Sequence, residues 1–217
     1  MHKTRRGLFA VGLGIALLAM VVAPASARPD AKGKAPVKFG YNLTTNTQPS
    51  NSVPPRKCSE ADPEGGNLED APCTRMQFQG SPAPGGIKAP SAGTITAIWV
   101  IAGKAGSFTP VVGFLSNISG THANGKITAK GPVLTHGSSF TSGSTYTIFK
   151  FPGLHIPVKK NEYLGIRSKA TSIVRCNSGG AGHFVFQPPL VVGAAPVANA
   201  GHDGCHLLIE AVMTPAT

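Results

Sequence analysis

The residues that could bind a metal lie closest together at positions 202–206, which read His-Asp-Gly-Cys-His. With His183 they offer imidazole, carboxylate and thiol groups, the donors that zinc and copper sites use. A strand beginning near Cys205 would turn Cys205 and His206 to opposite faces, and a disulfide would remove the thiolate. We therefore favour a structural loop held by a disulfide. In the alternative, a metal-binding loop, the candidate ligands are His183, His202, Asp203 and His206.

The segment Cys-Asn-Ser-Gly-Gly at positions 176–180 is similar to the nucleophile segment of chymotrypsin-like serine proteases. Those enzymes need a general-base histidine and a buried aspartate, both upstream of the serine. After the expected signal peptide three histidines precede Ser178, at positions 122, 136 and 155, but no aspartate lies between them and Ser178. The segment instead predicts a glycine-rich turn after a strand. We expect no catalytic residues, and a hydrolase that no motif reveals is the alternative.

Carboxylates are scarce in the second half of the chain. After Cys73 only Glu162, Asp203 and Glu210 occur, whereas glycoside hydrolysis needs two carboxylates at a controlled separation. Glu162 falls in an expected turn and Glu210 in an expected strand, so we expect both to be solvated charges. No glycine-rich phosphate loop opens a helix, and we expect no cofactor.

Aromatic side chains could serve a sugar-binding sandwich, which stacks sugars on exposed rings. The chain has one tryptophan, Trp99, within its most apolar segment, so we expect it in the core. Tyr146 and Tyr163 have polar neighbours and are the candidate ligand-binding residues.

The N-terminus has the pattern of a signal peptide. Residues 2–6 are basic, residues 7–23 are apolar and uncharged, and Ala25-Ser26-Ala27 suits signal peptidase. We expect cleavage after residue 27, no membrane span thereafter, and a secreted protein in the medium or at the cell surface. An uncleaved anchor is the alternative, since the apolar run approaches the length of a spanning helix. The pair Arg5-Arg6 leaves the export route open between general secretion and the twin-arginine system.

Four cysteines in an exported chain predict disulfides, because thiols are oxidised outside the cytoplasm. Of the three possible pairings we favour Cys58–Cys73 with Cys176–Cys205. The first would close a polar, glycine-rich loop that has no core of its own. The second would tie the end of one strand to the start of the last.

The formal net charge is +11, and five of the nine acidic residues lie between positions 60 and 70. The chain from Cys73 onward is therefore strongly cationic. Such a protein is attracted to anionic wall polymers or lipid head groups, although scattered charge also serves solubility. The basic residues are mostly single and lack interleaved aromatics, so nucleic-acid binding is not expected.

The elements that would position these residues are strands. Glycine and proline interrupt almost every window, and no segment keeps a helical apolar period for three turns. In residues 151–168 Leu154, Ile156 and Val158 alternate with polar neighbours, and Leu164 and Ile166 do so after a polar corner. This pattern predicts a hairpin that another sheet must cover.

Eight to ten such strands predict an all-β fold, specifically a jelly-roll-like antiparallel β-sandwich with a disordered N-terminal tail. We expect the sandwich over residues 57–217 and a flexible tail over 28–56. Within that tail the alternation of Val37, Phe39, Tyr41 and Leu43 could form one strand.

Four segments carry a resemblance to a known group: TRMQFQ (74–79), SAGTITAIWVIAG (91–103), IPVKKNEYLGI (156–166) and LLIEAVM (207–213). In this order they resemble exported actinobacterial proteins of unknown role that are predicted jelly-roll sandwiches. The resemblance covers about residues 73–214 and implies no catalytic residues. We therefore expect a non-catalytic binding or structural module, with a cell-wall glycan or another extracellular polymer as its partner. Ligand identity and oligomeric state stay open.

Overall fold

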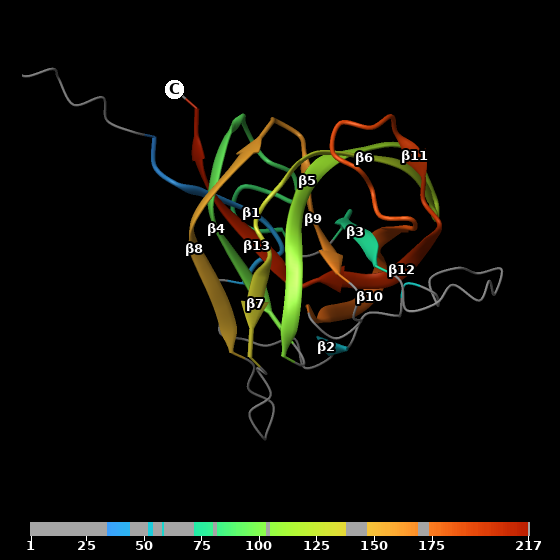
Figure 1. Cartoon of the computed structure of the whole chain (residues 1–217), viewed down its shortest axis with the longest axis horizontal. Coiled ribbons are helices and arrows are strands. Elements are labelled where there is room, and N and C mark those ends of the chain that lie inside the picture. The colour runs from blue at the N-terminus through green and yellow to red at the C-terminus, as the bar shows by residue number, and fades with distance from the viewer. Residues whose placement is uncertain are drawn as a thin grey trace, which may run out of the picture. The chain divides into compact units, whose positions relative to one another are not determined.

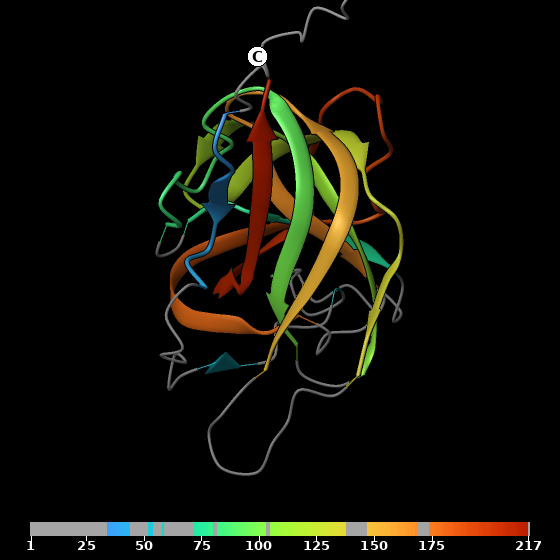
Figure 2. The ribbon, with the colours of Figure 1, turned by 90° about the vertical axis from the view of Figure 1, so that its left-hand side faces the viewer.

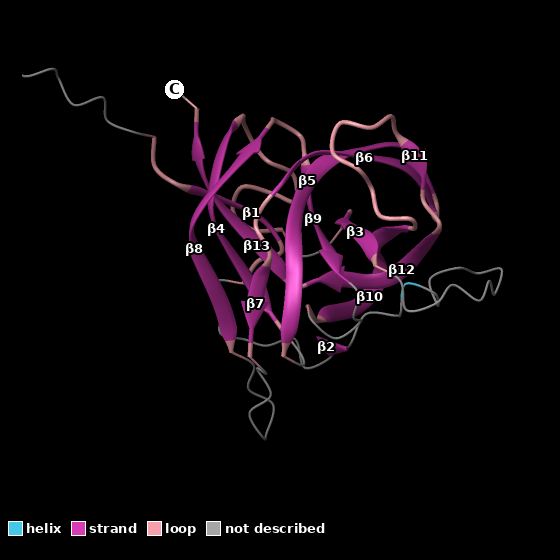
Figure 3. Ribbon diagram, viewed as in Figure 1, coloured by secondary structure: helices cyan, strands magenta, loops and turns pink. Residues whose placement is uncertain are grey.

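Strands form almost all the regular structure of the described chain (Figures 1 and 3). The computed structural model describes residues 34–43, 52–53, 58, 72–79, 82–102, 105–137, 147–168 and 174–216; at 52–53 and 178–181 it describes the backbone alone. The strands are β1 (Val37–Gly40), β2 (Ser52–Val53), β3 (Cys73–Gln77), β4 (Gly93–Ile101), β5 (Gly106–Ser119), β6 (His122–Lys130), β7 (Leu134–His136), β8 (Ile148–Val158), β9 (Tyr163–Ser168), β10 (Cys176–Phe186), β11 (Val197–Ala198), β12 (Gly201–Leu207) and β13 (Ile209–Pro215). The prediction of an all-β sandwich is confirmed.

One layer is a four-stranded antiparallel sheet in the order β1-β13-β4-β8 (Figure 2). Its central strand β4 buries Ile95, Ile98 and Val100 completely. A bulge in β4 opposite β13, between Ile95 and Ala97, brings Ile95 and Ile98 to the same face, because the extra residue shifts the alternation by one. This face covers the second layer.

The second layer is a rolled sheet in the order β11-β6-β5-β9-β3-β10-β12, with β2 and β7 attached at its margins. Its first and last members, β11 and β12, are successive parts of one segment. Asn199 donates its backbone N–H to Ala123 on β6 (2.9 Å), and Ala200 donates to Val185 on β10 (2.8 Å). The same segment therefore pairs with both ends of the sheet and closes it into a barrel (right-hand side of Figure 1).

The two layers enclose two apolar cores. The larger lies between the layers and combines residues of both sheets, such as Ile98 and Ile209 with Leu164 and Leu207. The smaller lies inside the barrel, where Phe184 and Phe186 of β10 meet Ile127 of β6. Each of these phenylalanines is at most 1% exposed and contributes roughly 2–3 kcal/mol of burial.

The expected hairpin at residues 151–168 is wrong, although its two strands are present as β8 and β9. Strand β8 pairs with β4, whereas β9 pairs with β3 and β5 in the other layer. The alternation itself is confirmed, since Leu154, Ile156 and Val158 are buried and the residues between them are exposed. Both strands bury their apolar faces in the interlayer core from opposite sides, so the connection is a corner between sheets.

A buried carboxylate holds this corner. Glu162 is completely buried and accepts hydrogen bonds from the Lys159 N–H (2.7 Å) and the Thr128 hydroxyl. Asn161, with φ of 68°, donates its N–H to Ala89 (2.8 Å). The expectation that Glu162 is a solvated charge is therefore wrong, because the tight corner needs an acceptor for its backbone donors.

The N-terminal boundary of the sandwich also differs from the prediction. Strand β1 pairs with β13, and Phe39, Tyr41 and Leu43 are all buried. The flexible-tail prediction for 28–56 is wrong for this stretch, and the possible strand is confirmed. The predicted signal peptide, residues 1–27, lies outside the described residues.

A second correction concerns residues 177–180, which were expected to form a turn. They belong to β10, whose pairing with β12 shifts register between Ser178 and His183. Glycines here permit close backbone approach, since a Cβ at Gly182 would collide with the backbone of Cys205. The glycine-rich stretch is thus a bulged strand.

Both favoured disulfides are confirmed. Cys58–Cys73 has Cα atoms 5.9 Å apart, and Cys176–Cys205 joins β10 to β12 with Cα atoms 5.4 Å apart. A closed loop of this size stabilises the fold by about 3 kcal/mol, mainly by restricting the unfolded chain. The two bonds indicate folding in an oxidising compartment. Within the described ranges, no helix has the length and apolarity to cross a membrane.

Replacing Gly125 by alanine should lower the free energy of unfolding by about 1–3 kcal/mol, because a Cβ there would lie less than 3.0 Å from three atoms of the Phe186 ring. Urea denaturation measures the loss. Gly137→Ala is the matched control, since a Cβ there meets nothing within 4 Å.

The contact also tests barrel closure, because β6 and β10 are not neighbours in the sheet order. Adding Phe186→Leu to Gly125→Ala should cost less than the sum of the two single changes. Strict additivity would argue against the rolled sheet.

Candidate functional site

A cluster of buried polar side chains interrupts the apolar interlayer space at one end of β3, β10 and β12. Gln77, His183 and Asp203 are register partners across these strands, so they share one face of the sheet. Arg75 lies two residues before Gln77 on the same face. All four are at most 6% exposed. Buried polar groups need hydrogen-bond partners within the protein, so the fold must hold these four side chains in defined positions.

The imidazole of His183 has a defined tautomer. Its Nδ1 lies 2.7 Å from the carbonyl oxygen of Cys205, which only accepts hydrogen bonds, so Nδ1 carries the proton. Burial lowers the pKa of His183 to about 4, with the Asp203 charge opposing and the Arg75 charge adding to the shift. The ring is therefore neutral at pH 7. Its Nε2 lone pair faces the Asp203 Oδ2 atom at 3.9 Å.

Arg75 supplies the balancing positive charge. Burial lowers its pKa to about 10, and the nearby Asp203 carboxylate opposes that shift, so the guanidinium stays charged at neutral pH. Its Nη1 donates to the Ser168 hydroxyl at 3.3 Å. Gln77 completes the polar surroundings by accepting the Leu207 N–H at 2.7 Å. One buried cation and one buried anion leave the cluster with no net charge.

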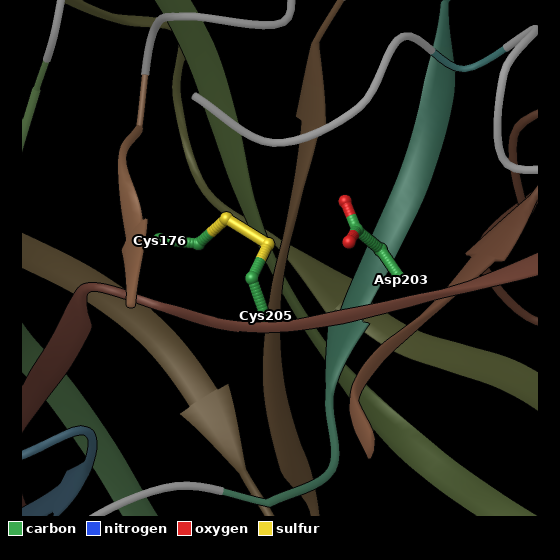
Figure 4. A group of neighbouring side chains, drawn as sticks. All are labelled: Cys176, Asp203 and Cys205. Atoms are coloured by element: carbon green, nitrogen blue, oxygen red, sulfur yellow. A yellow bond between two sulfur atoms is a disulfide. The ribbon is translucent and has the colours of Figure 1, made fainter. Parts of the chain in front are cut away.

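The Cys176–Cys205 disulfide borders this cluster (Figure 4). In Figure 4 the Asp203 and Cys205 side chains rise from the same side of β12, as alternate residues of a strand should. One carboxylate oxygen and the two sulfur atoms all lie within 4.8 Å of one another. The disulfide sulfur atoms, the Asp203 carboxylate and the His183 imidazole are thus neighbours in this cluster.

The structure brings together two of the four candidate metal ligands. His183 and Asp203 face each other, but His202 and His206 lie on the opposite side of β12. The His202 ring is 5.7 Å from the Phe184 ring, and His206 Nδ1 is 2.7 Å from the Gln79 carbonyl oxygen. The expected separation of Cys205 and His206 onto opposite faces is confirmed. The continuous 202–206 loop is accordingly not one binding site.

Among the described residues, the histidines that precede Ser178 in the sequence are not assembled into a hydrolase site. His136 is buried, with Nδ1 2.7 Å from the Gly137 carbonyl oxygen, and packs near Phe108 and Phe149. His122 and His155 are exposed. The Ser178 side chain lies outside what the structure describes, and its backbone pairs with Cys205.

The aromatic candidates have different outcomes. Tyr163 was expected to be exposed, which is wrong: it is 4% exposed and packs in the barrel beside Phe78. Strand β9 turns Leu164 and Ile166 to the interlayer core, so Tyr163 must point into the other one. This burial removes the reason for choosing it as a stacking residue. Tyr146 lies outside the described residues.

Trp99, which was expected in the core, is half-buried on the outer face of the four-stranded sheet. The ammonium groups of Lys38 and Lys150 lie 3.5 and 4.3 Å from its ring centroid. Lys38 also pairs with Glu210 Oε1 at 2.9 Å. Glu210 is fully buried and accepts the Leu43 N–H at 3.0 Å, so its expected solvation is wrong too.

A hollow of about 220 Å³ lies under the loop that follows β10. Its lining is mostly alanine, proline, valine and leucine, with Gln187 and Lys126 as the polar members. Small-molecule sites use several convergent polar groups to orient a substrate, and this hollow does not gather them. The polar cluster and the Trp99 face are the stronger candidates.

Comparisons of the chain with protein-family models, curated proteins and solved structures find no match.

The burial of His183 should appear in the pH dependence of stability. Between pH 6.5 and about 4 the unfolded chain binds a proton at this residue and the folded chain does not. Stability should therefore fall as pH falls through this window, by about 3 kcal/mol from this group alone.

His183→Asn keeps an N–H donor for Cys205 and removes the titration, so its stability should vary less over the same window. Urea denaturation at successive pH values measures the difference. His155→Asn, at an exposed position, is the control and should follow the wild-type curve. Parallel curves for His183→Asn and wild type would contradict the buried neutral imidazole.

Proposed function

We propose that the protein is a secreted, non-catalytic binding module that holds an anionic glycan of the cell envelope on the outer face of its four-stranded sheet. The observation that carries this proposal is the Trp99 ring with its two neighbouring ammonium groups, on a surface that shows no exposed carboxylate among the described residues.

The geometry suits a charged sugar. Trp99 on β4 and Lys150 on β8 are direct register partners, and Lys38 reaches the same ring from β1. An indole ring offers an apolar surface for the C–H face of a sugar. The Lys150 ammonium group beside it can pair with a carboxylate or phosphate on the same residue of the polymer, whereas the Lys38 ammonium group is paired with Glu210. The face therefore combines stacking with charge recognition.

The charge distribution selects an anionic partner. Within the described ranges the acidic residues are Glu162, Asp203 and Glu210, and all three are buried. The described surface thus presents lysine and arginine without exposed acidic side chains. Long-range attraction would concentrate such a protein on a polyanion, while a neutral polymer would gain nothing from it.

The same proposal covers the type of scaffold and the location. The orders β1-β13-β4-β8 and β6-β5-β9-β3 interleave early and late strands, as the paired Greek keys of a jelly roll do. Strands β10 to β12 would be an elaboration that closes the second layer. The disulfides, the signal-peptide pattern and the resemblance to exported actinobacterial sandwiches support secretion.

Sedimentation with insoluble glycans tests the function. The processed protein should bind polygalacturonate gel or phosphate-bearing wall material and should not bind cellulose. Binding should weaken steeply as salt is raised, because the attraction is screened. Comparing wall material before and after removal of its phosphate polymer separates phosphate from carboxylate recognition.

Two variants locate the binding face. Trp99→Ala should lower affinity about tenfold and Lys150→Ala severalfold, which are ordinary values for a cation-bearing aromatic contact. Lys130→Ala is the matched control, because it removes an exposed lysine from β6 in the other layer. Equal binding by Trp99→Ala and wild type, or equal binding to cellulose, would contradict the proposal.

A further inference from the structure

The donors around the Cys176–Cys205 disulfide form a set that the glycan-binding proposal does not use. Two sulfur atoms and an Asp203 oxygen lie within 4.8 Å of one another, and His183 Nε2 lies 3.9 Å from Asp203 Oδ2. Two neighbouring strands supply them: Cys176 and His183 come from β10, and Asp203 and Cys205 from β12.

His183 Nε2 is the independent sign of a ligand. It is completely buried, and among the described residues no atom forms a hydrogen bond with it. Since Nδ1 carries the proton, Nε2 is a lone pair aimed at a carboxylate, and two acceptors facing each other are unfavourable. A cation between them would pair with the Nε2 lone pair and remove this repulsion.

The histidine is also oriented as in known metal sites. Metal-bound imidazoles typically donate their second N–H to a carbonyl or carboxylate, which fixes the ring and its tautomer. Here the Nδ1–H of His183 donates to the Cys205 carbonyl oxygen.

We propose that reduction of the Cys176–Cys205 disulfide converts this buried cluster into a tetrahedral metal site of the zinc type, with the two thiolates, the Asp203 carboxylate and His183 Nε2 as ligands. Two thiolates, one imidazole and one carboxylate are donors that Zn²⁺ accepts in four-coordinate sites. While the disulfide is intact, its sulfurs carry no thiolate charge and the set is incomplete.

The chemistry balances with an external reductant, either a dithiol or a water-soluble phosphine. With a phosphine the S–S bond breaks, phosphorus is oxidised to the phosphine oxide with oxygen taken from water, and two thiols form. Metal binding then releases one proton from each thiol. The sulfur atoms must separate to about 3.8 Å, the spacing set by 2.3 Å Zn–S bonds at a tetrahedral angle.

Charge is balanced in both oxidation states. In the disulfide form the Asp203 carboxylate is offset by the Arg75 guanidinium. In the metal form two thiolates and a carboxylate bring three negative charges, and a divalent ion and Arg75 bring three positive ones. No net charge is buried in either state, so the large penalty for burying a charge is avoided.

Cobalt serves as the probe, because Co²⁺ takes zinc sites and its bonds to thiolate absorb strongly. The processed protein carrying Cys58→Ser and Cys73→Ser, so that only one cysteine pair remains, is titrated with Co²⁺ with and without the phosphine. We expect a thiolate–cobalt band only with the phosphine, saturating at one ion per chain and displaced by Zn²⁺.

Asp203→Asn and His183→Asn in the same background should each weaken cobalt binding at least tenfold, whereas His206→Asn, on the other face of β12, should leave it unchanged.

Circular dichroism follows the fold during the titration. If the reduced chain unfolds, and cobalt restores its folded spectrum only when Asp203 and His183 are present, the result supports the proposed metal site. No band, or a band of equal affinity in all variants, would overturn the proposal. Glycan sedimentation by these variants is an independent readout, since Trp99 lies in the other sheet.

Discussion

Closure of the rolled sheet by residues 197–207 is the constraint on which the other features depend. Asn199 makes the join: its Oδ1 accepts the Ala123 N–H at 2.8 Å, and its Nδ2 donates to the carbonyls of Thr121 and Gly201. The segment then enters β12 in one register. A register shift of one residue would exchange the two faces of β12. The hydrogen bonds of Asn199 therefore fix the register in which Asp203 faces His183 and Cys205 bonds to Cys176. It also removes open edges that could pair with another chain.

The strands of this fold follow from local pattern, but their partners do not. Alternation at Leu154, Ile156 and Val158 correctly predicts which side chains are buried, because period 2 is a property of one strand. It cannot distinguish a hairpin from a corner between sheets, since both bury the same residues. Closure by Asn199 is equally hidden, because it depends on contacts 76 or more positions away. The alternation of residues 37–43 predicted β1 as one possibility. Only its pairing with β13 shows that this segment is a strand and not part of a tail.

The candidate site shows the same division between local and distant information. The disulfide pairing and the opposite faces of Cys205 and His206 could be predicted from spacing and alternation. Arg75 and Gln77 were missed, because polar residues alternating with Met76 look like the solvent side of a strand. Only the packing of the two layers against each other shows that this side is covered. Glu210 was misjudged for the same reason, since Lys38 and Leu43 come from a segment that was expected to be a tail.

The placement of the acidic side chains has a consequence for how the surface responds to acidity. With Glu162, Asp203 and Glu210 enclosed, the described exterior has no carboxylate that can gain a proton as the medium acidifies. Where this described surface meets a polyanion, the response of attachment to acidity would thus depend on the ionisation of the polymer.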